Sequence, residues 1–339
     1  MSKQNSKPHY TCPSVWSDSY DEQAQRLVIK IVDYLNNKQL TKAWLAMVSA
    51  TKMATLSQLI NGKYPSPPQH MLQTLWSSCE NRDDRNKINS VPFVEATLFK
   101  LIVAACKFAR TLRCFSVITA SPGVGKTRSL EEYTALTNNV ILIKPNPMMS
   151  QGALLDQLVK ATHAIVQSGS QYKKGSREER FIAVYEALKG TDYLLILDEA
   201  NTVSSGAIET LRRIRDNAQV GVVLVGTQQL TNIIKPGLQF DQLSNRVSFW
   251  PKTIESITRE DADNVTQAGF AELEGLDEKI LNRLWDYHQG NMRVLTEMLI
   301  PSIKIFGLGQ GNSMSVKLID HIASSMLSLK PVVRKRGVA

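Results

Sequence analysis

One short segment of this chain has the residue types and spacing that suit phosphate chemistry. It is ASPGVGKT at 120–127, which follows an apolar run and ends in Lys126 and Thr127 at the expected start of a helix. Its two glycines let backbone N–H groups approach phosphate oxygens, and the helix N-terminus adds partial positive charge. Lys126 would reach the β- and γ-phosphates of a nucleotide, and the Thr127 hydroxyl would ligate Mg²⁺. The first position is Ala120 where the usual pattern has glycine, and that position only opens the turn.

A second segment, YLLILDEA at 193–200, is an apolar strand that ends in two adjacent carboxylates. Asp198 would join the shell of the Mg²⁺ ion, and Glu199 would orient and polarise an attacking water. The two motifs together predict hydrolysis of a nucleoside triphosphate, with Mg²⁺ as the metal held by Thr127 and Asp198. The expected nucleotide-binding residues are Ser121, Pro122, Gly123, Val124, Gly125, Lys126, Thr127, Arg128 and Asp198.

Phosphoryl transfer needs further polar and cationic groups, and three positions offer them. Thr227, or failing that Gln228, follows another apolar strand and could hydrogen-bond the water or the γ-phosphate. Arg293 in GNMR could fold over the phosphates, and Arg246 in LSNRV could project at a neighbouring subunit. Each arginine is equally a candidate for an ordinary solvated charge, and the run LRRIR at 211–215 competes for the role at the neighbour.

Strands that alternate with helices must position these residues. The expected strands are 116–120, 140–144, 193–198, 220–226 and 246–250. This alternation predicts an α/β fold with a mainly parallel sheet covered by helices. The expected organisation is a flexible tail (1–20), a helical domain (21–80), a linker (81–90), the α/β core (91–256), a helical region (257–328) and a basic tail (329–339).

Composition narrows the class of protein. The 339 residues are 43% hydrophobic and 21% charged, which is typical of a globular chain rather than a disordered or fibrous one. The net charge of +9 suits a polyanionic partner such as nucleic acid. No apolar run approaches the roughly 18 residues that span a bilayer, and no signal peptide is visible, so we expect an intracellular protein. Four scattered cysteines and five scattered histidines suggest reduced thiols and no protein-held metal cluster.

The order ASPGVGKT, LLILDEA, LVGTQ, LSNRV and GNMR resembles the AAA+ ATPases over roughly 91–328. The resemblance implies an α/β core followed by a small helical lid. It implies that Thr227 is sensor 1, Arg293 is sensor 2 in the lid, and Arg246 is an arginine finger acting in trans. It also implies that VPFVEA (91–96) lies where the adenine is held.

The segment 40–67 reads as helix, turn, helix and a stop at Asn61-Gly62. It resembles the helix-turn-helix of phage-repressor-like proteins, except that Ser49 or a neighbour replaces the usual glycine of the turn. Its second helix, about 52–60, would offer side chains to phosphates or base edges of DNA. A plain protein-binding helical domain is the alternative. The expected core is Leu45, Ala46, Met53, Leu56 and Leu59, and the expected DNA-facing residues are Lys52, Thr55, Ser57, Gln58, Lys63 and Tyr64.

A helix-turn-helix ahead of such a core is similar to the phage Mu B transposition protein family and related transposon helper ATPases, over about 25–328. The resemblance implies ATP-dependent helical filaments or rings on double-stranded DNA, recruitment and stimulation of a transposase, and cytoplasmic location in a bacterial or phage-infected cell. A separate target-selector protein is a further implied partner. Candidates to line the DNA channel are Lys173, Lys174 and Arg177, in a run that reads equally as a solvated loop.

Three alternatives stay open at this point. The first is a replicative helicase loader of the same superfamily, which would act with a helicase on single strands. The second is a DNA-binding repressor that uses nucleotide only as a structural ligand. The third is a signalling NTPase with the helical N-terminal region as a protein adaptor.

Overall fold

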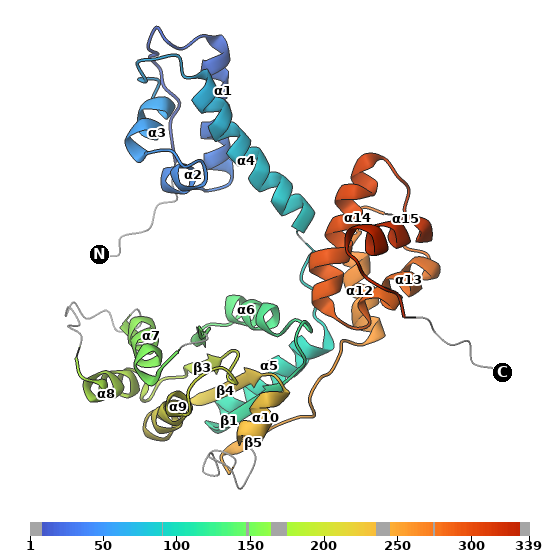
Figure 1. Ribbon diagram of the computed structural model, residues 1–339. Coiled ribbons are helices and arrows are strands. Elements are labelled where there is room, and N and C mark those ends of the chain that lie inside the picture. The colour runs from blue at the N-terminus through green and yellow to red at the C-terminus, as the bar shows by residue number, and fades with distance from the viewer. Residues whose placement is uncertain are drawn as a thin grey trace, which may run out of the picture. The chain divides into compact units, whose positions relative to one another are not determined.

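The computed structural model describes residues 9–89, 91–146, 149–163, 175–234, 245–273 and 275–332 (Figure 1). The chain forms two compact units, and the division falls between Ser90 and Val91. Within the described ranges, no helix is both long enough and apolar enough to cross a bilayer.

The N-terminal unit consists of helices around one apolar core. They are α1 (Glu22–Asn37), α2 (Lys42–Val48), α3 (Met53–Ile60) and α4 (Gln69–Asn89). Asp21 and Thr41 cap the first two helices by accepting backbone N–H groups of the first turn, which would otherwise lack partners. The core contains Val28, Ile31, Leu35, Leu45, Leu56, Leu59, Leu72 and Leu75, all without exposed surface.

In the turn between α2 and α3, an alanine stands where helix-turn-helix proteins usually have a glycine. Ser49 ends α2 with an ordinary φ of −92°, and Ala50 follows in the left-handed region with a φ of +52°. Of the residues expected in the shared core, Met53 is wrong, because its side chain is 49% exposed. Leu56, Leu59 and Ile60 form the buried face of α3, and Met53, at the first position of the helix, projects beyond that face.

The polar stretch interpreted as a linker, 81–90, is helical as far as Asn89 in α4. It contains neither glycine nor proline, so a helix already formed by the preceding apolar turns can continue through it. The first part of this stretch also packs: the Tyr34 hydroxyl donates to Asp83 Oδ1 at 2.9 Å, and the Arg82 guanidinium lies 5.4 Å from the centre of the Trp44 ring. The unit therefore extends further along the chain than its apolar residues suggest.

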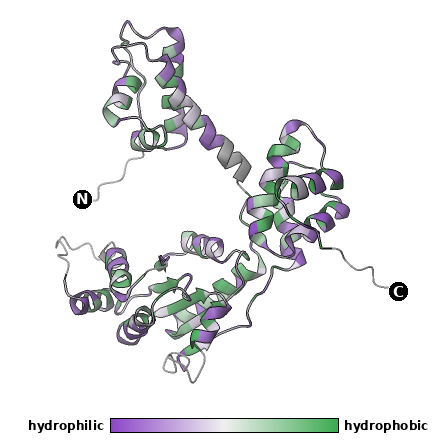
Figure 2. Cartoon of the chain, viewed as in Figure 1, coloured by the Kyte–Doolittle hydropathy of each residue, from purple (hydrophilic) through white to green (hydrophobic). Residues whose placement is uncertain are grey.

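The C-terminal unit is built on a five-stranded parallel sheet, in the order β2-β3-β4-β1-β5 among the described residues. This confirms the predicted α/β class. Alternate residues of each strand face opposite layers: Leu194 and Ile196 join one apolar cluster, and Leu195 and Leu197 join the other. The strands β3 and β4 are accordingly apolar throughout (Figure 2), as strands covered on both faces are. They are β1 (Phe115–Thr119), β2 (Val140–Ile143), β3 (Leu194–Leu197), β4 (Gly221–Gly226) and β5 (Val247–Phe249).

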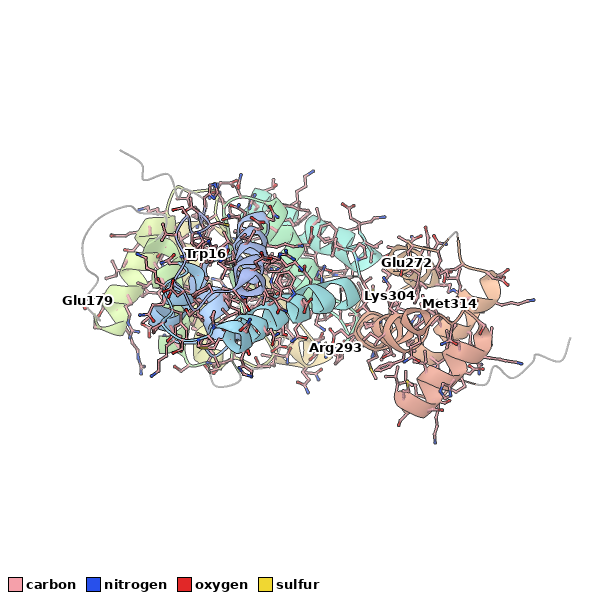
Figure 3. All side chains as sticks on the ribbon, turned by 90° about the horizontal axis from the view of Figure 1, so that it is seen from above. Trp16, Glu179, Glu272, Arg293, Lys304 and Met314 are labelled. Carbon is pink, nitrogen blue, oxygen red and sulfur yellow. The ribbon has the colours of Figure 1, made fainter. Side chains whose placement is uncertain are left out.

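Helices cover the sheet, and a further group of helices follows it. One apolar cluster combines α5, α6 and the later helices, and the other combines α7, α8, α9 and α10. The helices of the sheet region are α5 (Thr97–Leu112), α6 (Lys126–Leu136), α7 (Gln151–His163), α8 (Arg177–Leu188), α9 (Ser205–Ala218) and α10 (Gln228–Ile234). The helical lid consists of α12 (Arg259–Gly269), α13 (Glu278–His288), the π-helical segment Val294–Leu299, α14 (Ile300–Phe306), the 3₁₀ turn Leu308–Gln310, α15 (Val316–His321) and a second π-helical segment, Ile322–Met326. In the lid, Lys304 Nζ lies 3.1 Å from Glu272 Oε1 (Figure 3).

One carboxylate joins the lid to the start of α5. Asp261, which is almost fully buried, forms a capping box with Thr258 at the start of α12. Its Oδ1 also accepts the backbone N–H of Thr97 at 3.0 Å and the Thr97 hydroxyl at 3.3 Å. The N-cap residue of α5 is Ala96, which has no side-chain group to cap with. Asp261 therefore caps two helices, one in the core and one in the lid.

We predict that Ala50→Gly stabilises the N-terminal unit by about 1 kcal/mol. A residue with a Cβ pays a conformational cost in the left-handed region that glycine does not, and this gain exceeds the extra chain entropy of glycine in the unfolded state. Hydrogen exchange of the full-length protein, followed in peptides from 42–60, measures the change as slower exchange.

The matched control is Ala54→Gly, an identical change at an exposed position inside α3. It should destabilise the unit, because glycine in a helix costs about 0.5–1 kcal/mol relative to alanine. Faster exchange in both variants would contradict the assignment of Ala50 as the strained residue of the turn.

Candidate nucleotide-binding site

The loop that follows β1 is held in place on both sides. The Ala120 N–H donates to the Gly226 carbonyl of β4 at 3.0 Å. On the other side the segment after β5 pairs with the loop: the Ser121 N–H donates to the Ile254 carbonyl at 2.8 Å, and the Ile254 N–H donates to the Thr119 carbonyl at 3.0 Å. The loop therefore begins as an extension of the sheet, and Ala120 is fully buried there in ordinary extended backbone. This explains why alanine is tolerated at that position.

The two glycines of the loop have backbone conformations that favour glycine. Gly123 has a φ of +82°, and Gly125, the N-cap of α6, has a φ of +98°. A Cβ on Gly123 would also lie 2.4 Å from Asn291 Oδ1 of the lid. Because no capping side chain occupies the start of α6, its first N–H groups remain available to an anion.

Lys126 lies at the start of α6 with its ammonium turned back over the loop. Its Nζ donates to the Ala120 and Ser121 carbonyls, both at 2.8 Å. Burial lowers the pKa of the Lys126 ammonium, while the nearby Asp198 and Glu199 carboxylates raise it and Arg293 lowers it. A phosphate brought to this loop would supply the negative charge that the buried ammonium lacks.

The first acidic residue after β3 reaches the loop directly. Thr127 Oγ1 donates to Asp198 Oδ2 at 2.7 Å, although the two residues are 71 positions apart. Asp198 is almost fully buried, and its other oxygen accepts the Glu199 N–H at 2.8 Å. Glu199 is exposed and has a φ of +44°, a strained conformation for a residue with a side chain. The structure thus brings Lys126, Thr127, Asp198 and Glu199 to one edge of the sheet.

Thr227 follows β4 at the same edge, between the strands that lead to Asp198 and to the loop. Its backbone N–H donates to Asn201 Oδ1 at 2.9 Å. Gln228, the second choice from the sequence, instead accepts a hydrogen bond from Thr253, whose hydroxyl also lies 2.7 Å from that of Thr119. Thr227, in contrast, has a buried hydroxyl with no hydrogen-bond partner among the described residues.

The lid touches the loop through the segment that precedes its first π-helical turn. The Arg293 N–H donates to the Gly123 carbonyl at 2.9 Å. The Arg293 side chain is exposed (Figure 3). Its Nε lies 3.6 Å from Glu297 Oε2. The lid arginine therefore lies beside the phosphate loop, but its guanidinium faces a lid carboxylate.

Arg246 lies at the opposite edge of the sheet. Its carbonyl accepts the N–H of Phe115, the first residue of β1, at 3.2 Å, and its Nε lies 3.4 Å from Asp216 Oδ2. The five residues of β1 span about 16 Å between this edge and the loop. Arg246 is therefore not brought together with the other candidates of its own chain. The competing arginines of α9 are engaged: Arg212 with Glu209 and Asp216, Arg213 with Glu209, and Arg215 with Asp216.

The candidate DNA-binding residues belong to other segments of the chain, some of them in the N-terminal unit. In the N-terminal unit Lys52, Gln58 and Lys63 are exposed, and Thr55 is half-buried. Arg177 is exposed at the start of α8. Lys173 and Lys174 lie outside the described residues.

Sequence reasoning missed Asn201, Thr253 and Asn291, which contact the site through hydrogen bonds or close packing. Asn201 lies two residues beyond Glu199, so its place beside the acidic motif was the one available signal. Thr253 and Asn291 reach the loop from more than 120 residues away along the chain, and no local pattern marks them.

Comparison with known proteins finds a matching family model and similar chains. A family model described as an AAA domain matches residues 110–234. The Mu-like prophage FluMu DNA transposition protein B of Haemophilus influenzae is 27% identical over 277 residues, which cover 80% of this chain and 94% of the relative. The ATP-dependent target DNA activator B of Escherichia phage Mu is 28% identical over 218 residues, which cover 63% of this chain and 68% of the relative.

Two solved structures share the fold. The ORC2 protein of Aeropyrum pernix, in ADPNP-ADP complexes, has a TM-score of 0.52 at 16% identity, covering 74% of this chain and 73% of that one. A Walker-type ATPase of Pyrococcus abyssi has a TM-score of 0.51 at 14% identity, covering 70% and 74%. At these identities the likeness supports the P-loop architecture alone.

His288 supports the turn that carries the lid to the loop, and it generates a prediction on pH. Its Nδ1 accepts the Gly290 N–H at 3.1 Å, so that nitrogen must be unprotonated. Burial, with a smaller effect of Arg259, lowers the pKa of His288 from 6.5 to about 4. Between these values the unfolded chain binds a proton that the folded chain does not, so stability falls as the pH falls. The loss across the whole window is about 3 kcal/mol.

Equilibrium urea unfolding at pH 7.5 and pH 4.5 measures this loss, and His288→Gln is the comparison. Glutamine can accept the same hydrogen bond without titrating, so between these two pH values the variant should lack about 2.5 kcal/mol of the wild-type pH dependence. If both proteins lost stability in parallel, His288 would not be the titrating group.

Proposed function

We propose that this AAA-type P-loop protein of the Mu B transposition protein family binds target DNA in an ATP-dependent manner. In this proposal it oligomerises on double-stranded DNA, recruits and stimulates a transposase, and hydrolyses ATP to disassemble. The observation that carries the proposal is the convergence of Lys126, Thr127 and Asp198 in a chain similar to an ATP-dependent target DNA activator.

The residues at the carboxyl edge of the sheet fit a nucleotide with Mg²⁺. A threonine hydroxyl and a buried carboxylate are the hard oxygen donors that Mg²⁺ prefers, and Thr127 Oγ1 and Asp198 Oδ2 already lie 2.7 Å apart. No group of three or more His, Cys, Asp or Glu residues within the described ranges could hold a metal alone. A metal there would share its coordination with phosphate oxygens and water, and it would neutralise charge on the phosphates.

Each candidate residue of the site then has a role in ATP hydrolysis. Lys126 exchanges its two carbonyl partners for phosphate oxygens, and the N–H groups of the loop bind the same phosphates. Glu199 orients and polarises the attacking water, and the Thr227 hydroxyl hydrogen-bonds that water or the γ-phosphate. Arg293 lies in the lid next to the phosphate loop, and its guanidinium contributes positive charge to the phosphates once it leaves Glu297.

Arg246 acts at a neighbouring subunit in this proposal. Arg246 lies beside the start of β1, and the length of that strand, about 16 Å, separates it from its own phosphate loop. This separation argues against action within one chain. An arginine supplied by a neighbour would make the site complete only in the oligomer, so assembly and hydrolysis would be coupled.

Two surfaces are our candidates for DNA contact. The exposed Lys52, Gln58 and Lys63 belong to or flank the second helix of the helix-turn-helix, the element that enters the major groove in proteins of that architecture. Arg177, with Lys173 and Lys174 nearby in the sequence, would contact backbone phosphates in the α/β unit.

We predict opposite effects for two substitutions at the nucleotide site. Glu199→Gln should leave ATP binding intact and trap the protein on DNA, because the water is no longer activated. Lys126→Ala should abolish ATP-dependent DNA binding, because the phosphates lose their cation. Co-sedimentation with duplex DNA, with and without ATP, measures both effects, and electron microscopy of the same samples tests for filaments or rings.

Single-stranded DNA is the control substrate in that experiment. Preference for single strands would favour the helicase-loader alternative over target binding. Release of Glu199→Gln from duplex DNA at the wild-type rate in ATP would contradict the coupling of hydrolysis to disassembly.

The salt dependence of DNA binding should report the lysines of the N-terminal unit. Each phosphate contact that is lost lowers the slope of log K against log salt concentration by about 1. The double substitution Lys52→Ala and Lys63→Ala should therefore lower the slope by about 2 per subunit. Lys317→Ala, an exposed lysine of the lid, is the matched control and should leave the slope unchanged. An unchanged slope in the double variant would remove this helix from the DNA interface.

A further inference from the structure

One side chain outside the nucleotide-binding motifs joins the two strand ends that carry Glu199 and Thr227. Asn201 lies in the turn after β3, and its Oδ1 accepts the backbone N–H of Thr227 at 2.9 Å. A backbone hydrogen bond runs between the same segments, from the Ala200 N–H to the Val225 carbonyl at 2.9 Å. The turn that presents Glu199 is thus fixed to the residue that presents Thr227.

The close approach of Asn201 requires glycine at position 226. A Cβ on Gly226 would lie 2.7 Å from Asn201 Oδ1 and 3.1 Å from Leu230 Cδ2, so a larger residue would push the amide away. The Gly226 carbonyl also accepts the N–H of Ala120, the first residue of the phosphate loop. Asn201 therefore packs against the residue that ties β4 to the loop.

The turn held by Asn201 is conformationally strained. Glu199 has a φ of +44°, and such a conformation persists only where surrounding contacts determine it. Asp198 Oδ1 accepts the Glu199 N–H, and the Thr202 N–H and hydroxyl both donate to the Glu199 carbonyl at 2.8 Å. These contacts lie within the turn itself. The hydrogen bond from the Thr227 N–H to Asn201 adds a side-chain contact between the turn and the residue that follows β4.

The Thr227 hydroxyl is the group that this contact positions. Thr227 Oγ1 is buried and has no hydrogen-bond partner in the described part of the chain. A buried hydroxyl without a partner costs free energy, so its persistence points to an oxygen of a ligand or of its water. With the Thr227 N–H held by Asn201, the hydroxyl is kept at the carboxyl edge of the sheet, after the strand next to the one that leads to Asp198 and Glu199.

We propose that Asn201 is a positioning residue for ATP hydrolysis. By holding the Thr227 N–H, it fixes the Thr227 hydroxyl relative to the Glu199 carboxylate, so that both address the same γ-phosphate and water. Asn201 itself touches neither. The proposal rests on the proposed ATPase function and adds to it a side chain that acts through two others.

The test compares three full-length variants in steady-state ATP hydrolysis with DNA, and in equilibrium binding of a fluorescent ATP analogue. Asn201→Ala removes the acceptor, and we expect kcat to fall on the order of 10- to 100-fold while nucleotide affinity stays within about threefold. Asn201→Asp keeps an acceptor oxygen in the same place and should retain kcat within about threefold. Asn217→Ala removes an exposed asparagine of α9 and is the matched control, with kcat within about twofold of wild type.

Each outcome decides the matter. Rescue by aspartate but not alanine, at constant nucleotide affinity, supports positioning. A parallel loss of nucleotide affinity and kcat in Asn201→Ala would overturn the proposal in favour of a purely structural role. Equal kcat in wild type and Asn201→Ala would also overturn it, because Asn201 would then have no effect on hydrolysis. If the wild type bound nucleotide but did not hydrolyse it, the proposed function would fail instead. Hydrogen exchange would then test the Asn201 contact alone, as faster exchange of the Thr227 amide in Asn201→Ala.

Discussion

The parallel register of β3, β4 and β1 is the constraint on which the candidate site depends. Because these strands run side by side in one direction, the segments that follow them emerge at a single edge. The ladder continues past the strand ends, through the Ala200 N–H to Val225 and the Ala120 N–H to Gly226. The apolar residues that hold the sheet between its two helical layers therefore also set the distances among Lys126, Thr127 and Asp198. Stability of the core and geometry of the site have the same origin.

The polar groups of the site are largely paired with one another. Lys126 donates to two loop carbonyls, Thr127 donates to Asp198, and the Arg293 side chain lies beside Glu297. A nucleotide would exchange these partners for phosphate oxygens, so its net binding free energy is the difference between two sets of hydrogen bonds. The contact from Arg293 to Gly123 is made by the backbone, which leaves the guanidinium able to change partner while the lid stays in contact with the loop.

The sequence was sufficient for the fold class and the approximate positions of the strands, and both candidate phosphate motifs follow strands as expected. Apolar runs with sharp polar ends determine a buried parallel strand almost by themselves. It was insufficient where a residue's environment comes from distant parts of the chain. Asn201 and Asp261 are ordinary polar residues in the sequence, and their roles depend on Thr227 and Thr97, which lie 26 and 164 positions away. Met53 has the right spacing for a core residue, yet its position at the start of α3 exposes it.

Asp261 limits how the chain can change in length. It caps the beginnings of α5 and α12 at once, and a helix turns by about 100° for each residue. One residue inserted between Thr258 and Asp261 would swing the carboxylate away from Thr97 and uncap α5, whatever happened to α12. The beginnings of these two helices are thus fixed relative to each other, and a change of chain length within that short interval would separate them.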